Sequence, residues 1–211
     1  MGWQLNGLSG WDENPPRVAN NFSGILVILG GARCVWDDVK NLEDILPRDK
    51  CQHMAINDIG AYWHHELTHW VTLHGMYMSG WRKFRMGHGY GNGDHVFTHS
   101  MRMPSATNHP DIDEWWDIDF GGGTSSMLGV ILAFGLGYSK VILCGIPMDK
   151  SGHFFDAPWY ITPELEGHSE KVVWREAIRD RFVNKVKSMS GNTRDWLGEP
   201  TEEWLNGECR R

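Results

Sequence analysis

The sequence predicts one α/β domain, a Rossmann-like three-layer arrangement around a mostly parallel sheet. Two continuous apolar runs, at residues 24–29 and 140–144, are typical of strands that are buried on both faces. Segments with helical periodicity alternate with short apolar runs, which is the order of βαβ units. The 211 residues are enough to bury one substantial core.

The first strand and helix are predicted within residues 24–46. The strand Gly-Ile-Leu-Val-Ile-Leu at residues 24–29 ends at Gly30 and Gly31, which supply a tight turn. From Val35 to Leu46, apolar residues recur every three or four positions, and Pro47 ends this amphipathic pattern.

Shorter elements are predicted next along the chain. Apolar runs at residues 53–56 and 70–73 predict two strands, with a short helix over residues 59–67 between them. Neither the helical nor the strand period of apolar residues persists through residues 76–123, and we predict one strand there, at residues 95–98.

The second half of the chain predicts a buried helix that leads directly into a strand. Residues 124–136 are small or apolar all round, and Gly137 is a suitable C-cap. The strand at residues 140–144 completes the second unit. A helix over residues 169–189 closes the predicted domain, which spans residues 24–190 between an N-terminal arm (1–23) and a C-terminal tail (191–211).

Composition narrows the class of partner. A net charge of −7 argues against binding to a nucleic-acid backbone, and no apolar run approaches the roughly 20 residues of a membrane span. The N-terminus has no basic and apolar signal pattern, and four scattered cysteines without a C-x-x-C pair indicate reduced thiols. We therefore expect a cytoplasmic protein with a small-molecule substrate; a homo-oligomer is compatible with the sequence.

Polar and glycine residues follow several predicted strands. Ligands of open parallel sheets bind outside the carboxyl ends of the strands, where the strand order reverses. Gly30 and Gly31 would let a phosphate approach the backbone, and Arg33 could donate to it, although a plain turn explains the glycines equally well. The other predicted strand-end site residues are Asn57, Asp58, His74, Gly145 and Asp149.

The start of the buried helix is a second candidate anion site. Glycines and hydroxyl residues lie together at Gly123, Thr124, Ser125 and Ser126. The free N–H groups of a helix N-terminus and such hydroxyls together form an anion cradle, and a loop with an ordinary N-cap is the alternative.

Residues 122–146, Gly-Gly-Thr-Ser-Ser-Met-Leu-Gly-Val-Ile-Leu-Ala-Phe-Gly-Leu-Gly-Tyr-Ser-Lys-Val-Ile-Leu-Cys-Gly-Ile, carry a family resemblance. They resemble the Ser-containing helix and following strand of bacterial sialyltransferases, and the related domain of motility-associated glycosyltransferases and archaeal 6-hydroxymethylpterin diphosphokinases. Residues 70–75 and 25–33 are similar to the second group's strand ending in Leu-His-Pro and to its first strand. The chain differs in having Gly-Gly-Ala-Arg-Cys for Gly-x-Gly-Pro-Ser and Gly75 for proline. Small proteins of this kind also occur in phage genomes, which would place this one in the host cytoplasm.

The resemblance implies a bound nucleotide or nucleotide-sugar, with a CMP-type nucleotide favoured over ATP, and glycosyl transfer as the activity. His153 and His168 lie where the sialyltransferases place their base, His74 could contact phosphate, and Asp149 could hold Mg²⁺. Each histidine could instead be structural. Diphosphate transfer from ATP and non-catalytic nucleotide binding are the alternatives within this fold.

A zinc hydrolase is a further alternative, because His65, Glu66 and His69 form an H-E-x-x-H pattern. That pattern holds zinc only within a continuing helix, whereas a strand is predicted from Trp70. Thr72 and Gly75 also occupy the positions where the extended metalloprotease motif needs glycine and histidine.

Overall fold

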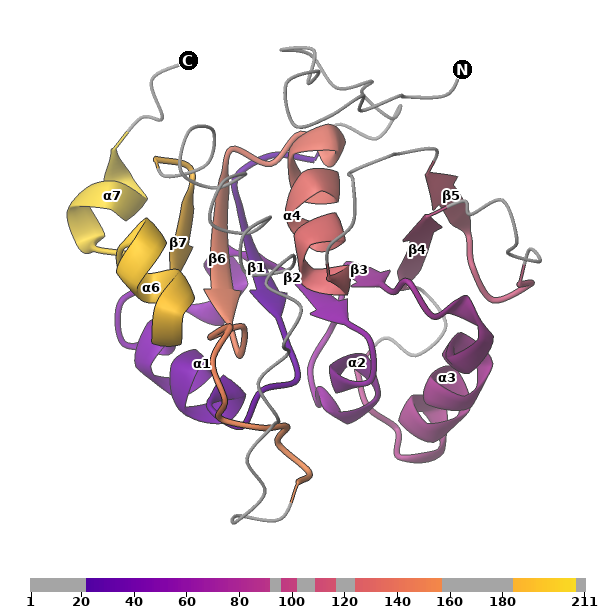
Figure 1. Ribbon diagram of the computed structural model, residues 1–211. Coiled ribbons are helices and arrows are strands. Elements are labelled where there is room, and N and C mark those ends of the chain that lie inside the picture. Colours follow the sequence, from indigo (N-terminus) through magenta and orange to yellow (C-terminus); the bar gives the residue numbers. More distant parts are fainter. Residues whose placement is uncertain (1–21, 92–95, 102–108, 117–123, 157–183, 208–211) are drawn as a thin grey trace.

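The computed structural model describes residues 22–91, 96–101, 109–116, 124–156 and 184–207. Within these residues, seven parallel strands form one sheet that is flanked by helices (Figure 1). The predicted α/β, Rossmann-like fold is confirmed.

The strands and helices have the following bounds. The strands are β1 (Ile25–Leu29), β2 (Gln52–Ile56), β3 (His69–Val71), β4 (Phe97–Met101), β5 (Glu114–Trp116), β6 (Lys140–Cys144) and β7 (Val186–Ser188). The helices are α1 (Val35–Glu43), α2 (Ile59–Tyr62), α3 (Met78–Gly87), α4 (Ser125–Leu136), α6 (Gly191–Leu197) and α7 (Glu202–Asn206).

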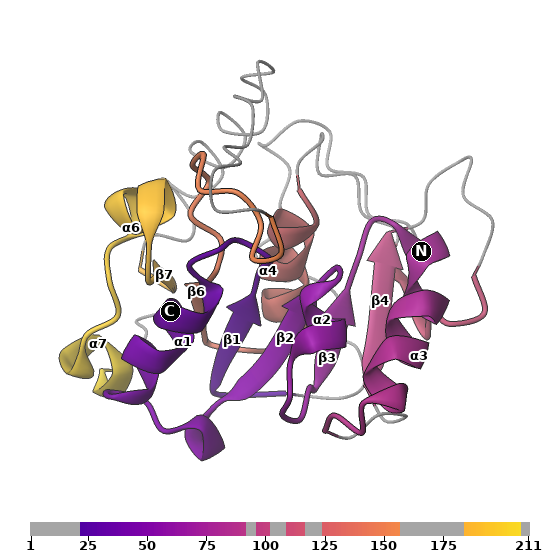
Figure 2. The same ribbon diagram turned by 90° about the horizontal axis from the view of Figure 1, so that it is seen from below.

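The strand order is β5-β4-β3-β2-β1-β6-β7. From β1 to β5 the chain builds the sheet in one direction, and Figure 2 shows β1 to β4 side by side. After α4 it returns to the other side of β1 and adds β6 and then β7, with Leu29 opposite Cys144 at the carboxyl ends of β1 and β6. The strand order therefore reverses between β1 and β6.

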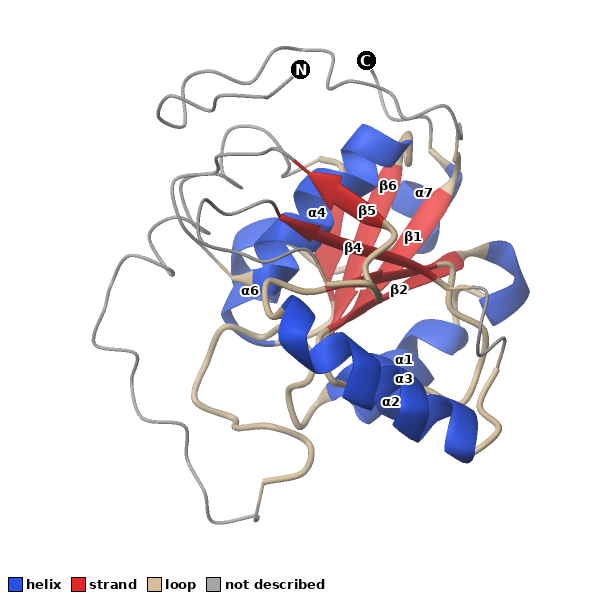
Figure 3. Cartoon of the chain, turned by 90° about the vertical axis from the view of Figure 1, so that its right-hand side faces the viewer, coloured by secondary structure: helices blue, strands red, loops and turns tan. Residues whose placement is uncertain are grey.

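Two apolar cores lie on the two faces of the sheet. On one face, Leu26 and Ile28 of β1 pack with α4 and with Leu197 of α6. On the other, Val27 and Leu29 pack with α1, α2 and Met78 of α3. Figure 3 shows the same division, with α1, α2 and α3 grouped on one face and α4 and α6 on the other. Alternate residues of β1 thus enter different cores, as expected for a strand buried on both faces.

Helix α4 is the element that the sequence predicts best. The hydroxyl of Thr124 caps it by accepting a bond from the Met127 N–H (3.2 Å), and Gly137 ends it in the left-handed conformation, with φ of 106°. A Cβ on Gly129 would lie 2.7 Å from the Ile56 side chain, so this glycine lets α4 lie directly on the sheet.

Several elements differ from the predictions. Helix α1 ends at Glu43, and α2 ends at Tyr62, because the backbone after it is extended. The helix predicted to reach residue 189 is wrong at its end: Val186–Ser188 pairs with β6 as a strand, and residues 169–183 lie outside the described part of the chain. Helices α3, α6 and α7 and strand β5 were not predicted. Helices α6 and α7 lie in the predicted tail, and α6 packs against β7.

Candidate functional site

A cleft of about 280 Å³ lies at the carboxyl ends of β1, β2 and β6, where the strand order reverses. Four segments that are distant in the sequence meet there. Its lining consists of Gly30, Gly31, Ala32, Ile56, Asn57, Asp58, Thr124, Ser125, Ser126, Gly145, Ile146, Pro147, Met148, Asp149, Ser151, Gly152 and His153. Most of the predicted site residues are therefore neighbours.

The two glycines after β1 permit close packing at the cleft wall. The Gly30 N–H donates to the Cys144 carbonyl (2.8 Å), and a Cβ on Gly30 would overlap the Gly145 carbonyl. A Cβ on Gly31 would overlap the ring of His153. Arg33 is not in the lining, although its backbone N–H binds the Gly152 carbonyl (3.0 Å).

A buried carboxylate that the sequence analysis missed fixes the loop after β6. Asp38 accepts bonds from the Gly145 N–H (2.8 Å) and the Ser190 hydroxyl (2.7 Å). Burial raises the pKa of Asp38, and these hydrogen bonds oppose the shift. The available signal was an aspartate between Val35 and Leu42 on the apolar stripe of α1.

Asn57, at the end of β2, presents hydrogen-bond donors to the cleft. Its backbone has φ of 56°, and its carbonyl accepts from the Trp70 indole N–H (2.5 Å). The buried Thr72 hydroxyl accepts from the His74 N–H and donates to Asn57 Oδ1, both at 2.8 Å. If the amide were flipped, the Thr72 hydroxyl hydrogen would lose its acceptor. Asn57 Oδ1 is therefore engaged, and no hydrogen bond within the described residues uses the Nδ2 hydrogens, which can donate to a ligand.

The N-terminus of α4 forms another part of the lining. Thr124 Oγ1 and Ser126 Oγ are 2.7 Å apart, and Ser125 Oγ accepts from the Leu73 N–H (3.2 Å). The first N–H groups of a helix have no partner one turn earlier, and the helix dipole makes this end positive. This end of α4 can therefore donate to an anionic group. The predicted Gly123 lies outside the described residues.

Ionisable groups occupy the remaining side of the cleft. His153 Nδ1 lies 3.9 Å from Asp58 Oδ2, and Asp149 Oδ1 accepts from the Ser151 N–H (2.8 Å). Burial raises the pKa of Asp58, while His153 lowers it. The described residues of the lining include two carboxylates and neither lysine nor arginine. Among the described lining residues, backbone N–H groups and His153 are therefore the groups that can balance the charge of an anionic ligand.

Two predicted histidines are not placed in the cleft. His74 is absent from the lining, and its ring lies 6.3 Å from that of Tyr77. His168 lies outside the described residues.

The H-E-x-x-H segment lacks the helix that its zinc-binding geometry requires. His65 and Glu66 lie in an irregular stretch after α2, and His69 is in β3. The buried His69 ring is hydrogen-bonded to the His99 ring and to the Tyr138 hydroxyl, each at 3.0 Å. The two histidines of the pattern therefore do not share a helical face.

No family model matches the chain, and neither a curated protein nor a solved structure matches it significantly. No helix in the described ranges has the length and apolar character needed to cross a membrane.

Proposed function

We propose that this protein is a nucleotide-dependent transferase and that the cleft binds the phosphate-bearing part of a nucleotide-sugar. The main support is the position of the cleft at the reversal between β1 and β6, where ligands of such sheets bind. Asn57 and the N-terminus of α4 line the same cleft, and both have N–H groups that can donate hydrogen bonds to a ligand.

Glycosyl transfer is the favoured reaction, with a CMP-type nucleotide as the leaving group. The cleft must stabilise negative charge on the departing phosphate, and the N–H groups of α4 are suited to this. Mg²⁺ prefers one or two carboxylates together with phosphate oxygens, and Asp149 has one oxygen that accepts from Ser151 and a second that can face a cation. Asp149 would thus hold a Mg²⁺ that neutralises phosphate charge.

Diphosphate transfer from ATP and non-catalytic nucleotide binding would use the same cleft. The nucleotide that raises Tm distinguishes diphosphate transfer, which would use ATP, from glycosyl transfer, which would use a CMP-type nucleotide. Loss of turnover, with unchanged nucleotide affinity, on substitution of His153 would separate catalysis from simple binding.

A thermal-shift panel of CMP, CDP, UDP, AMP, ADP, ATP and their sugar conjugates, with and without Mg²⁺, tests the proposal. A ligand at 100 times its Kd adds about 2.7 kcal/mol to the free energy of unfolding and raises Tm by several degrees. We expect a cytidine nucleotide to do this. If every nucleotide leaves Tm unchanged at millimolar concentration, the proposal is wrong.

Ser126→Asp locates the binding. A carboxylate in the first turn of α4 is favourable for the helix, but it repels a phosphate at the same N-terminus. We expect nucleotide affinity to fall by about 100-fold or more, because the variant removes donors and adds a like charge. Ser139→Asp is the matched control, since Ser139 is bonded to the Gly24 carbonyl just before β6, at the opposite edge of the sheet. Equal affinities in both variants would place the nucleotide elsewhere.

A further inference from the structure

We infer that Asp58 and His153 form a proton-transfer pair, in which His153 is the base and Asp58 is the residue that positions it. The inference rests on the proposed function, which supplies the transfer reaction. Asp58 follows β2, and His153 lies in the loop after β6, so the pair spans the reversal of the strand order. Their side chains, 18% and 42% exposed, approach to 3.9 Å between Oδ2 and Nδ1.

The loop that carries His153 is held against the loop after β1. Ala32 and His153 form an antiparallel bridge, and the Phe154 N–H donates to the Gly31 carbonyl (3.0 Å). The His153 N–H itself donates to Asp156 Oδ2 (2.7 Å). These backbone contacts place the imidazole over Gly31, where only a glycine leaves room for the ring.

The two ring nitrogens of His153 have different surroundings. Nδ1 is buried, and it has no hydrogen-bond partner within the described residues. Its neighbour across the 3.9 Å gap is the Asp58 carboxylate, and catalytic hydrogen bonds of this kind often shorten only when substrate binds. A proton on Nδ1 directed at Asp58 leaves the lone pair on Nε2. Nε2 is therefore the nitrogen that can meet a substrate.

The proton transfer balances as follows. His153 Nε2 takes the proton of an acceptor hydroxyl while the acceptor oxygen forms a bond to the anomeric carbon of the donor sugar. The bond between that carbon and the phosphate oxygen breaks, and the nucleotide leaves with the electron pair. Asp58 stabilises the imidazolium and keeps the ring in one tautomer, which is the role of a carboxylate beside a catalytic histidine.

Acylation of His153 by diethyl pyrocarbonate tests the pair without a substrate. The reagent modifies neutral imidazole, and mass spectrometry of the His153 peptide of the full chain follows the rate of this modification at a fixed, mildly acidic pH. Besides Asp58, the charged residues around His153 within the described chain are Asp149 in the same lining, Asp156, which accepts from the His153 backbone N–H, and Arg33, whose backbone N–H donates to Gly152. We expect Asp58→Asn to speed the modification of His153, because the substitution removes the opposite charge that favours the imidazolium, the form that the reagent does not modify.

Asp37→Asn is the matched control, since Asp37 is an exposed aspartate in the first turn of α1 and does not line the cleft. An unchanged modification rate in a folded Asp58→Asn protein, or an equal increase in Asp37→Asn, would overturn the pairing.

The reciprocal experiment covers the case in which Asp58→Asn does not fold. His153→Gln alters a half-exposed side chain, and it should raise the pKa of Asp58 further, because His153 lowers that pKa in the native protein. Carbon-13 NMR of the carboxyl group measures it, and an unchanged Asp58 pKa contradicts the inference. Both readouts are independent of nucleotide binding, so a failed pair and a failed nucleotide proposal give different results.

Discussion

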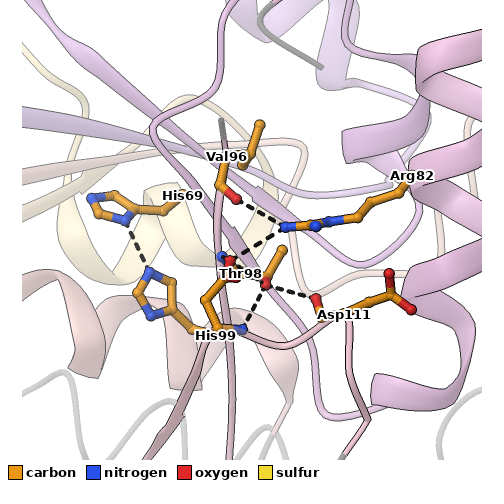
Figure 4. Close-up of polar contacts among 7 residues, drawn as sticks. His69, Arg82, Val96, Thr98, His99 and Asp111 are labelled. Carbon is orange, nitrogen blue, oxygen red and sulfur yellow. Dashed lines mark hydrogen bonds and ion pairs between the residues drawn. The ribbon is translucent and has the colours of Figure 1, made fainter. Parts of the chain in front are cut away.

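Histidines occupy two contrasting regions of this protein, one beneath the outer strands and one in the cleft. In the buried region, shown in Figure 4, the His69 ring points toward His99. The Trp116 indole N–H can only donate, so His99 Nδ1 is an acceptor (3.2 Å) and the His99 proton is on Nε2. His99 then donates to His69 Nδ1, His69 Nε2–H donates to the Tyr138 hydroxyl, and Tyr138 donates to Gln52.

Each nitrogen of these two buried rings therefore has a partner, and both rings are neutral. Burial lowers the pKa of His69 to about 3 and that of His99 to about 4. His153 differs from these rings in exposure and in hydrogen bonding. Its ring is half-exposed, and its Nδ1 has no hydrogen-bond partner among the described residues. A buried histidine with a lowered pKa is therefore structural when both of its ring nitrogens have hydrogen-bond partners. A ring beside a cleft that has a nitrogen without a partner indicates a binding or catalytic role.

Removal of a ring from the complete network should have the largest effect on stability. His69→Ala leaves a cavity in the core and removes the partners of His99 and Tyr138. We expect the free energy of unfolding to fall by about 3–5 kcal/mol. His153→Ala, on the half-exposed ring, should cost less than about 1 kcal/mol. Urea denaturation measures both, and similar losses in the two variants would remove the distinction between the regions.

Acidification should have the second-largest effect, because it lowers the free energy of unfolding that the two buried neutral rings contribute. The unfolded chain binds protons on His69 and His99 below about pH 6.5, whereas the folded chain does so only near their lowered pKa values. The stability that these neutral rings contribute is thus complete above pH 6.5 and is lost as the pH falls toward 4. We expect a loss of roughly 2–4 kcal/mol across that range, by linkage. His99→Gln should lose less over the same range, and a parallel pH profile for the variant would contradict neutral rings.

Alanine substitutions of a core glycine and of a cleft glycine should differ by a smaller amount in the free energy of unfolding. A Cβ on Gly60 would overlap the fully buried Trp70 ring, while one on Gly31 would overlap the half-exposed His153 ring. We expect Gly60→Ala to cost about 2–3 kcal/mol and Gly31→Ala about 1 kcal/mol or less, because only the exposed ring can move aside. Chemical denaturation compares them. If Gly31→Ala were the more damaging change, the cleft wall would be as rigid as the core.

The fold could be predicted from the sequence wherever one signal extended over enough residues. The apolar runs of β1 and β6 and the capped helix α4 were found, since burial on both faces and N- and C-capping leave clear patterns. Strands β5 and β7 have three residues each, too few to show a period. Their strand geometry depends on pairing with β4 and β6, which local sequence does not report.

Only part of the candidate site could be predicted, because some of its residues act through contacts that the local sequence does not report. The rule that ligands bind at strand ends identified Asn57, Asp58 and Gly145, which do line the cleft. Asp38 and Thr72 were missed because each acts through a neighbour, on Gly145 and Asn57, and such second contacts appear only in three dimensions. The zinc pattern is a local coincidence, since His69 belongs to a strand.

A proton–nitrogen NMR titration of the labelled protein with the nucleotide selected by the thermal-shift panel tests the central claim most directly. We expect saturable shifts in the Asn57 side-chain NH₂ and in the backbone amides of Gly31, Ser125 and Ser126, with the His69 and His99 rings unchanged. Shifts confined to residues away from the cleft, or an Asn57 NH₂ signal that does not move at saturation, would contradict it.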